Sequence, residues 1–395
     1  MTKSKELRMK KILALYDQWN TTIEVNLGSL TSILNDGKHE LKSDESKKVT
    51  SKELDWCDVC YAIRPASVYM LRIMQAVKKA GKLFVSTYDD DFLDMPRGST
   101  ERWKTEYVRQ CLVNSDVVVT CNPLLLQKYK KIAPCPSYII LDAHVLEQDI
   151  KVVPIIKDRI RIVYAAGKDH TELFDQYIKP SIDDIFDKFG HRVSLTLMGV
   201  EPRLDGLNHT KQIEVIPTKP LDEYNEYMAG HDFDIGLSPL PDTPFCNRKY
   251  FNKYIEYSKN GILGVYSRCL PYTLVVKDHV NGILTDNTVS GWKKSIFESI
   301  ERIDEMKIMA IKAQQHLRES FSIATARRIW YENIDNKIQT SERGMVVVTY
   351  QHARLQEFAY EFLTLLHRVS AHVKSEGLGK TIKIILKHYA WGNKQ

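Results

Sequence analysis

Short apolar runs alternate with amphipathic stretches along the first 150 residues. The runs that predict buried strands are 11–16, 59–63, 83–88, 117–121 and 138–141. Between them, 68–80 and 103–112 show the three- and four-residue spacing of amphipathic helices. Strands that alternate with helices favour a parallel sheet covered on both faces. Residues 36–55 are polar and charged, and the pattern leaves the second strand of this sheet open.

A second alternating series follows a charged link at 147–158. Its predicted strands are 160–165, 193–198, 213–216, 233–237, 262–266 and 282–285, and the pattern is then helical from Trp292 to about residue 337. The chain is therefore predicted to be α/β, with two Rossmann-like, doubly wound domains that face a ligand cleft. We expect one domain at 1–155, a second at 156–340, and a tail at 341–395.

The tail has a different pattern. Apolar residues recur every three or four positions at Leu355, Phe358, Phe362, Leu365, Val369 and Val373, which predicts an amphipathic helix. Gly377 and Gly379 end this pattern, and the last sixteen residues mix lysines with aliphatic and aromatic side chains. Residues 377–395 therefore suit an anionic membrane surface, or equally a docking contact with the protein's own body.

Composition narrows the class of protein. A chain of 395 residues with 43% hydrophobic and 27% charged residues has enough material for two domains and an appendage. The net charge of +6 fits an anionic substrate or a membrane surface, but it is too diffuse to indicate nucleic acid. Seven cysteines and an N-terminus without an apolar segment indicate the cytoplasm, with peripheral attachment at the inner face of the membrane left open.

The candidate chemistry is densest in residues 233–264. A strand there leads into a proline-rich loop, and a helix is predicted to begin near Asn247. Lys249, Lys253 and Glu256 would then lie within about 60° of one another on one helix face. Two cations and a carboxylate beside a strand end suit a phosphorylated ligand with an adjoining polyol. The alternative is a solvated helix face with an ordinary Lys–Glu pair.

Two other loops follow predicted strands. Asp89, Asp90 and Asp91 come after the strand at 83–88, and their carboxylates can bind a metal, orient sugar hydroxyls or cap the next helix. The turn at 167–171 contains Gly167, Lys168 and His170, so it can offer backbone N–H groups and a basic side chain to a phosphate. An ordinary strand-to-helix turn would have the same composition.

The stretch FDIGLSPLPDTPFCNRKYFNKYIEYSKNGILGVYSRCLPYTLVVKDHVNGILTDN resembles the donor-binding domain of GT-B glycosyltransferases of the family-4-like retaining group. The similarity lies in a strand, a proline loop, a Lys-x3-Lys-x2-Glu-Tyr segment, a Pro-Tyr pair and a Val-Asn-Gly-Ile-Leu hairpin. A weaker resemblance includes Gly167 and the Met198–Gly199 pair, and the first domain at DVCYAIR, AGKLFVSTYDDDF and NSDVVVTCNPLL. It extends over about residues 10–335.

The resemblance implies a GT-B fold and a hexosyltransferase-type enzyme. Such an enzyme would move a sugar from a nucleoside-diphosphate sugar to a glycan or lipid-linked acceptor, with no metal or other cofactor. By position, Glu256 would bind the ribose hydroxyls, and Lys253 and Lys249 would counter the diphosphate. Lys168 or His170 would assist from the opposite side, or His170 would contact the sugar or the acceptor.

The implied site residues form three sets. The donor set is Gly167, Lys168, His170, Gly199, Asn247, Lys249, Lys253 and Glu256; the acceptor set is Arg64, Asp89 and Asp90; the catalytic set is Lys253, Glu256 and Asp89. The DDD run is not interpreted as the metal motif of the other glycosyltransferase fold, because the surrounding architecture differs.

The sequence departs from the family pattern at one important place. Relatives have a sugar-contacting glutamate eight positions before Glu256, where this chain has Arg248, and neighbouring Asn247 is the candidate substitute. The first domain also lacks the long glycine-rich loop of many relatives. These departures motivate a second hypothesis, a non-catalytic GT-B partner that binds a glycan or stabilises another transferase. A third hypothesis is a nucleotide-sugar epimerase on the same architecture.

Overall fold

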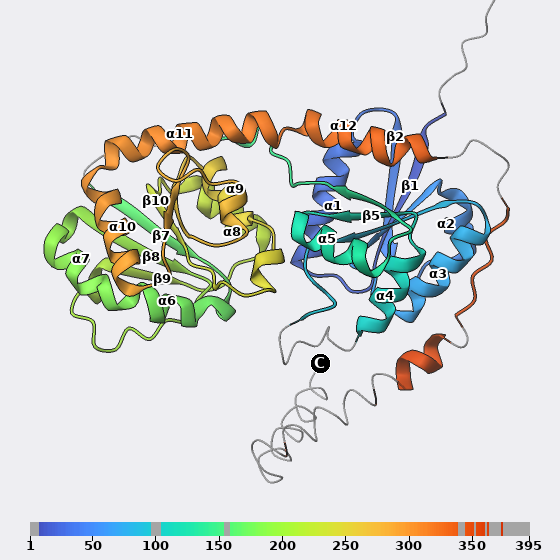
Figure 1. Ribbon diagram of the computed structural model, residues 1–395, viewed down its shortest axis with the longest axis horizontal. Coiled ribbons are helices and arrows are strands. Elements are labelled where there is room, and N and C mark those ends of the chain that lie inside the picture. Colours follow the sequence, from blue (N-terminus) through green and yellow to red (C-terminus); the bar gives the residue numbers. More distant parts are fainter. Residues whose placement is uncertain are drawn as a thin grey trace, which may run out of the picture.

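Two six-stranded sheets form the centres of two domains that lie side by side (Figure 1). The computed structural model describes residues 8–95, 104–153, 159–338, 344–350, 353–359, 362 and 373. Every strand pairs in parallel with its neighbours. The predicted class, two doubly wound α/β domains, is confirmed.

The first sheet has the order β2-β1-β3-β4-β5-β6. Its strands are β1 (Lys10–Tyr16), β2 (His39–Glu45), β3 (Val59–Ile63), β4 (Leu83–Tyr88), β5 (Val117–Thr120) and β6 (Ser137–Ile140). The helices are α1 (Thr21–Leu34), α2 (Ser51–Trp56), α3 (Val68–Lys79), α4 (Thr105–Asn114) and α5 (Pro123–Ile132). Strands β3 and β5 are buried at every position, as continuous apolar runs in a parallel sheet should be.

Strand β2 lies in the polar segment whose pattern left it open. Its sequence, HELKSDE, has one apolar residue, and only His39 is buried. The strand is at the edge of the sheet, where β1 pairs with it along its whole length and its side chains reach solvent. A polar edge strand of this kind is held by backbone hydrogen bonds, so hydrophobic periodicity does not reveal it.

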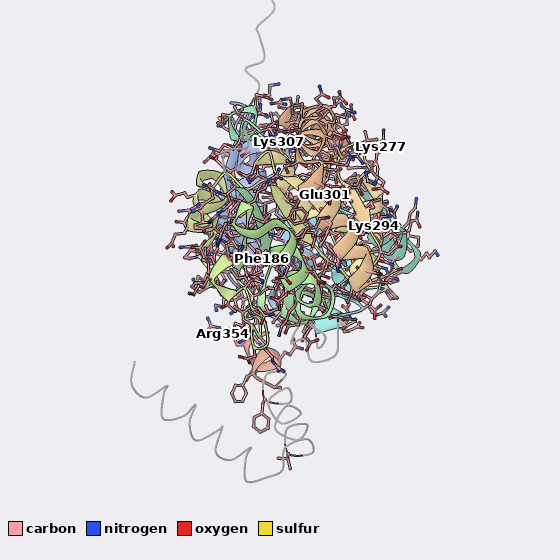
Figure 2. The ribbon with its side chains drawn as sticks, turned by 90° about the vertical axis from the view of Figure 1, so that its left-hand side faces the viewer. Phe186, Lys277, Lys294, Glu301, Lys307 and Arg354 are labelled. Carbon is pink, nitrogen blue, oxygen red and sulfur yellow. The ribbon has the colours of Figure 1, made fainter. Side chains whose placement is uncertain are left out.

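The second sheet has the order β12-β11-β10-β7-β8-β9. Its strands are β7 (Ile160–Ala165), β8 (Val193–Met198), β9 (Ile213–Ile216), β10 (Ile235–Ser238), β11 (Leu263–Ser267) and β12 (Ile283–Thr285). The helices are α6 (Thr171–Tyr177), α7 (Ile182–Phe189), α8 (Leu221–Gly230), α9 (Asn252–Lys259), α10 (Val289–Glu301) and α11 (Ile303–Ser320). Figure 2 faces the outer end of this domain, where Phe186 of α7 and Lys294 of α10 are labelled.

Helix α12 (Ile323–Asn333) returns the chain to the first domain, although residues 156–340 were expected to belong to the second. Its Trp330 is fully buried in the apolar cluster that contains Ile12 and Tyr61. The guanidinium of Arg327 donates hydrogen bonds to the carbonyl oxygens of Ser32 (2.9 Å), Ile33 (3.0 Å) and Asn35 (2.8 Å) at the end of α1. These carbonyls have no partner within their own helix, so α12 completes the first domain.

A buried polar network fixes the end of α12 to β2. His39 lies between two carboxylates: its Nδ1 is 3.0 Å from Asp36 and its Nε2 is 3.0 Å from Asp335. Asp335 also accepts from Trp330 Nε1 at 2.9 Å and pairs with Lys10 Nζ at 3.0 Å. Burial acts to lower the pKa of His39, but the hydrogen bonds to Asp335 and Asp36 outweigh burial and raise it. The two carboxylates therefore favour the protonated, imidazolium form of His39.

The pKa values of the two carboxyl groups move in the complementary direction. Burial acts to raise the pKa of Asp36, but hydrogen bonds from Tyr331, the Lys38 amide and His39 lower it to about 2. The pKa of Asp335 is lowered in the same way by His39 and Lys10, against its burial. Both carboxylates therefore stabilise the fold above their ordinary pKa, and the contribution of Asp36 is lost only as the pH falls through about 2.

Residues 344–350 run along the first domain as an extended strap. The Val346 amide donates to Asp55 at 2.6 Å, and the Val348 amide donates to Ser51 at 3.1 Å. Beyond it, residues 353–359 are helical, and Ala353 packs against Val68 and Tyr69.

The described part of the tail helix exposes apolar side chains. Leu355 is 67% exposed, Phe358 is 70% exposed and Phe362 is 52% exposed. Figure 2 shows Arg354 below the two domains, where this helix leaves them. The tail helix was predicted from Leu355 to Val373. Beyond residue 359, the structure describes only Phe362 and Val373 of it, and residues 377–395 lie outside the described residues. Within the described residues, no helix combines the length and the apolar character that crossing a bilayer requires.

The His39 network makes a prediction about pH. The folded pKa of His39 is above the ordinary value near 6.5, so its stabilisation is complete below about pH 6 and is lost as the pH rises through the folded pKa. Replacing His39 by Gln should lower the free energy of unfolding by about 3–5 kcal/mol at pH 6 and by less at pH 9. Calorimetric unfolding at both pH values measures the difference.

His191→Gln is the matched control, because His191 lies on the surface of the second domain. It should change stability by less than about 0.5 kcal/mol at either pH. An equal loss at pH 6 and pH 9 for His39→Gln would contradict an imidazolium in this network.

Candidate active site

Two cavities open between the domains, at the carboxyl ends of the strands. The first has a volume of about 360 Å³ and is lined mainly by the first domain. The second has a volume of about 170 Å³ and lies where the order of the second sheet reverses, between β7 and β10. Crevices at such switch points are where ligands bind in open parallel sheets. Lys249, Tyr250 and Asn252 line both cavities, so the two are adjacent.

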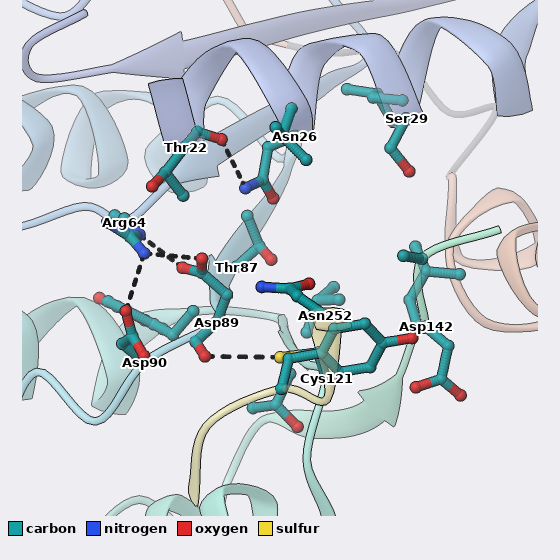
Figure 3. Close-up of a pocket in the computed structure, with 18 of the residues that line it drawn as sticks. Thr22, Asn26, Ser29, Arg64, Thr87, Asp89, Asp90, Cys121, Asp142 and Asn252 are labelled. Carbon is teal, nitrogen blue, oxygen red and sulfur yellow. Dashed lines mark hydrogen bonds and ion pairs between the residues drawn. The ribbon is translucent and has the colours of Figure 1, made fainter. Parts of the chain in front are cut away.

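Arg64 and two aspartates form the polar wall of the first cavity (Figure 3). Arg64 follows β3 with a positive φ of 50°, and its guanidinium donates to Asp89 at 2.5 and 2.6 Å and to Asp90 at 3.0 Å. The bidentate pair with Asp89 and the single bond to Asp90 fix both carboxylates in the cavity that the threonines and Asn26 of α1 also line. The wall thus offers oriented oxygen acceptors and a cation, which suits a polyhydroxylated ligand.

The third aspartate of the run has a different environment. Asp91 is 1% exposed, and its carboxylate pairs with Lys128 Nζ at 2.6 Å and Arg248 Nη1 at 2.9 Å. The three adjacent carboxylates therefore divide between the cavity and a buried ion pair. Within the described residues, no group of three or more His, Cys, Asp or Glu side chains could hold a metal ion.

Asp142 is a cavity residue that the sequence analysis did not select. It lies two residues beyond β6 and lines the first cavity on the side away from Arg64 (Figure 3). Burial raises the pKa of Asp142 to about 6, although the influence of the Tyr250 hydroxyl acts in the opposite direction. A carboxyl group with a pKa near neutrality can accept and return a proton. Its position directly after a predicted strand was the available signal.

The second cavity brings together basic groups from two loops and a helix. Gly167 and His170 follow β7, while Lys249 and Lys253 come from the segment after β10. Burial lowers the pKa of His170; Asp169 opposes this change, and the charges of Lys249 and Lys253 add to it. The cavity thus places a neutral imidazole beside two ammonium groups, which is an environment for an anion such as a phosphate.

Lys253 and Glu256 form a pair on α9. Lys253 Nζ lies 2.8 Å from Glu256 Oε2 and 2.9 Å from the Tyr224 hydroxyl, which also donates to Glu256. Lys253 lines the second cavity, whereas Glu256 does not. The predicted approach of Lys253 and Glu256 on one helix face is observed, with Tyr224 of α8 as an additional partner.

The predicted start of this helix near Asn247 is wrong. Helix α9 begins at Asn252, and Lys249 is extended, with φ −71° and ψ 164°. Residues Cys246–Arg248 form only a 3-10 turn, and Nδ2 of Asn122 in the first domain donates to the carbonyl oxygens of Asn247 (3.1 Å) and Lys249 (2.8 Å). These two carbonyl oxygens accept hydrogen bonds from Asn122, which competes with the hydrogen bonds of an α-helix. Lys249 nevertheless lines the second cavity together with Lys253.

Three other residues of the implied donor set lie outside the cavity lining. Lys168 is exposed and pairs with Glu201 at 2.6 Å. Asn247 donates to Asp242 at 2.8 Å. Gly199 has a φ of +78°, and a Cβ there would lie 2.3 Å from the carbonyl oxygen of Ala166. Gly199 therefore shapes the turn after β8 against the loop that carries Gly167.

Comparison with known proteins places this architecture among the GT-B folds. HepE of Anabaena, solved with UDP and glucose, aligns with a TM-score of 0.60 and 13% identity over 83% of this chain and all of its own. A glycosyltransferase from Rickettsia africae aligns with a TM-score of 0.60 and 11% identity over 84% of this chain and 100% of its own. The sequence matches no family model and no curated protein.

A third similar structure is WaaG, a glycosyltransferase involved in lipopolysaccharide biosynthesis. It aligns with a TM-score of 0.56 and 8% identity over 82% of this chain and 99% of its own. At these identities, the shared property is the fold. The predicted GT-B architecture is confirmed.

The turn at Gly199 leads to a prediction about stability. Replacing Gly199 by Ala should lower the free energy of unfolding by about 1–3 kcal/mol, because φ +78° and the Ala166 carbonyl both oppose a side chain. Gly167→Ala is the comparison, since its Cβ would meet a movable carboxylate oxygen of Asp169, at 2.6 Å. Calorimetry of both variants measures the difference, and equal stability would contradict the structural role of Gly199.

Proposed function

We propose that this chain transfers a sugar from a nucleoside-diphosphate sugar to a glycan or lipid-linked acceptor. The observation behind the proposal is the pair of adjacent cavities that share Lys249, Tyr250 and Asn252. The smaller cavity is basic and lies at the switch point of the second sheet, where a nucleoside diphosphate would bind. The larger cavity is lined with hydroxyl, amide and carboxylate groups that suit a sugar acceptor.

The proposed reaction uses positive charge in place of a metal and retains the anomeric configuration. The bond between the anomeric carbon and the diphosphate oxygen breaks, the acceptor oxygen bonds to that carbon, and the acceptor proton passes to the departing phosphate oxygen. Negative charge grows on the diphosphate as an oxocarbenium-like transition state forms. Lys249 and Lys253 line the cavity that would hold the diphosphate. Positive charges that are already in place stabilise such a transition state strongly.

The remaining residues have supporting roles in this proposal. Glu256 would accept hydrogen bonds from the ribose hydroxyls, as the family resemblance implies, while keeping Lys253 in place. Arg64, Asp89 and Asp90 would hold the acceptor. HepE was solved with UDP and with UDP-glucose, so UDP is the first nucleotide to test.

The cation beside the diphosphate gives a quantitative prediction. Lys253→Ala or Glu256→Ala should lower the rate of transfer by about a hundredfold or more, which is the usual range for loss of a charge-stabilising group. Lys259→Ala, in the last turn of the same helix, is the matched control and should retain nearly full activity. A screen of nucleotide-sugar donors that detects the released nucleotide provides the assay. Near-normal turnover of both site variants would contradict the assignment.

The same screen separates the other hypotheses. Calorimetry with UDP, GDP and ADP should detect binding of at least one nucleotide. Failure of all three would favour a non-catalytic partner that binds a glycan. Conversion of the donor's sugar when no acceptor is present would indicate a nucleotide-sugar epimerase.

We also propose that the tail binds an anionic membrane surface. Its described part projects exposed apolar side chains at Leu355, Phe358 and Phe362, and lysines follow at 380, 383, 387 and 394. Apolar and basic groups together favour an interface rich in anionic lipid. The strap at 344–350 fixes this segment to the domain that would hold the acceptor.

Deletion of residues 377–395 tests this role. The deletion should weaken co-sedimentation with phosphatidylglycerol vesicles and leave the weak binding to phosphatidylcholine vesicles unchanged, because the lysines act through charge. A full-length variant with Lys380, Lys383 and Lys387 changed to Gln is the charge control and should behave like the deletion. Unchanged binding of both variants would mean that the tail packs on the protein itself.

A further inference from the structure

The segment at 247–252 belongs to the second domain in sequence but is held by the first. It carries the three residues that line both cavities, Lys249, Tyr250 and Asn252. The segment joins a short 3-10 turn, Cys246–Arg248, to the start of α9, and its own backbone hydrogen bonds are those of the turn. Its position, and therefore the shape of both cavities, depends on contacts across the domain boundary.

Asn122 provides the first of these contacts. It is 1% exposed and caps α5, because its Oδ1 accepts from the amides of Leu124 (2.8 Å) and Leu125 (3.3 Å). Both of its Nδ2 hydrogens are directed to the other domain, to the carbonyl oxygens of Asn247 and Lys249. One amide group thus connects the start of α5 to the backbone on either side of Arg248.

Asp91 provides the second contact. Its carboxylate is buried and already has Lys128 of its own domain as a partner, at 2.6 Å. Arg248 adds a second cation at 2.9 Å from the opposite domain and also reaches Asp94 at 3.3 Å. An ion pair around a buried carboxylate is far more sensitive to loss of a partner than an exposed pair. The Arg248 pair therefore favours the arrangement in which residues 247–252 lie against the first domain.

We propose that Asp91, Asn122 and Arg248 are positioning residues, which complete the donor site by holding residues 247–252 against the first domain. This inference rests on the proposed function. Arg248, which stands where relatives have a sugar-contacting glutamate, here acts through the other domain and holds Lys249 between the two cavities. Domains joined by linkers move relative to one another by default, so these bonds supply the geometry that the linkers do not.

The test compares single substitutions at the two contacts. Arg248→Gln removes the cation but leaves Asp91 paired with Lys128, so the first domain keeps its fold. Asn122→Asp keeps a capping oxygen for α5 but replaces the donor with a carboxylate that faces two carbonyls. Arg268→Gln is the matched control, because it breaks an arginine–aspartate pair, 2.6 Å long, within the second domain.

Two measurements are made on the full-length protein. Hydrogen exchange at the Arg248 and Lys249 amides, which bond to the carbonyls of Phe245 and Cys246, reports whether the segment is held. Calorimetric titration with UDP reports whether the donor site is formed. We expect Arg248→Gln and Asn122→Asp to speed exchange and to weaken UDP binding by about tenfold, the usual size of a coupling between sites. Arg248→Lys should recover part of the affinity, and Arg268→Gln should match the unaltered protein.

Other outcomes would overturn the proposal. Unchanged exchange would show that these bonds do not hold the segment. Faster exchange with unchanged UDP affinity would show a structural contact that does not position the donor site. If the unaltered protein binds no UDP, the proposed function fails for that nucleotide, whereas the exchange data still decide whether Asp91, Asn122 and Arg248 hold residues 247–252.

Discussion

Parallel pairing of every strand is the constraint on which the other features of this molecule depend. A parallel strand needs a crossover helix to reach its neighbour, so helices cover both faces of each sheet and only the strand ends remain open to ligands. The polar loops after β3, β4, β6, β7 and β10 therefore collect along one edge of each sheet. Because the two edges face each other, residues from both domains line adjacent cavities.

The two cavities differ in electrostatic character. In the first, the carboxylates of Asp89 and Asp90 are balanced by Arg64, and Asp142 has a pKa raised to about 6 by burial. In the second, lysines lie beside a histidine whose pKa burial lowers, so the positive charge belongs to the ammonium groups. A neutral polyol and a phosphorylated ligand would therefore prefer different cavities, and the segment at 247–252 separates them.

The return of the chain to the first domain connects the two halves a second time. Trp330 fills the core beneath β1 and β3, while His39 and Asp335 fix the end of α12 to the edge strand. From there the strap at 344–350 continues over the first domain. Any surface that the tail binds would therefore be linked to the first domain, whose residues form most of the lining of the 360 Å³ cavity.

The sequence by itself determined the alternation of strands and helices, the two α/β domains and the approach of Lys253 to Glu256, because these follow from local periodicity and from spacing on one helix. It left β2 open, since an edge strand needs no apolar run. The start of α9 and the use of Arg248 were decided by the tertiary structure alone. The hydrogen bond from Asn122 to Lys249 joins residues 127 positions apart, and the ion pair of Asp91 with Arg248 joins residues 157 positions apart. Contacts between residues so distant in sequence exist only after both sheets have formed, so no local pattern encodes them.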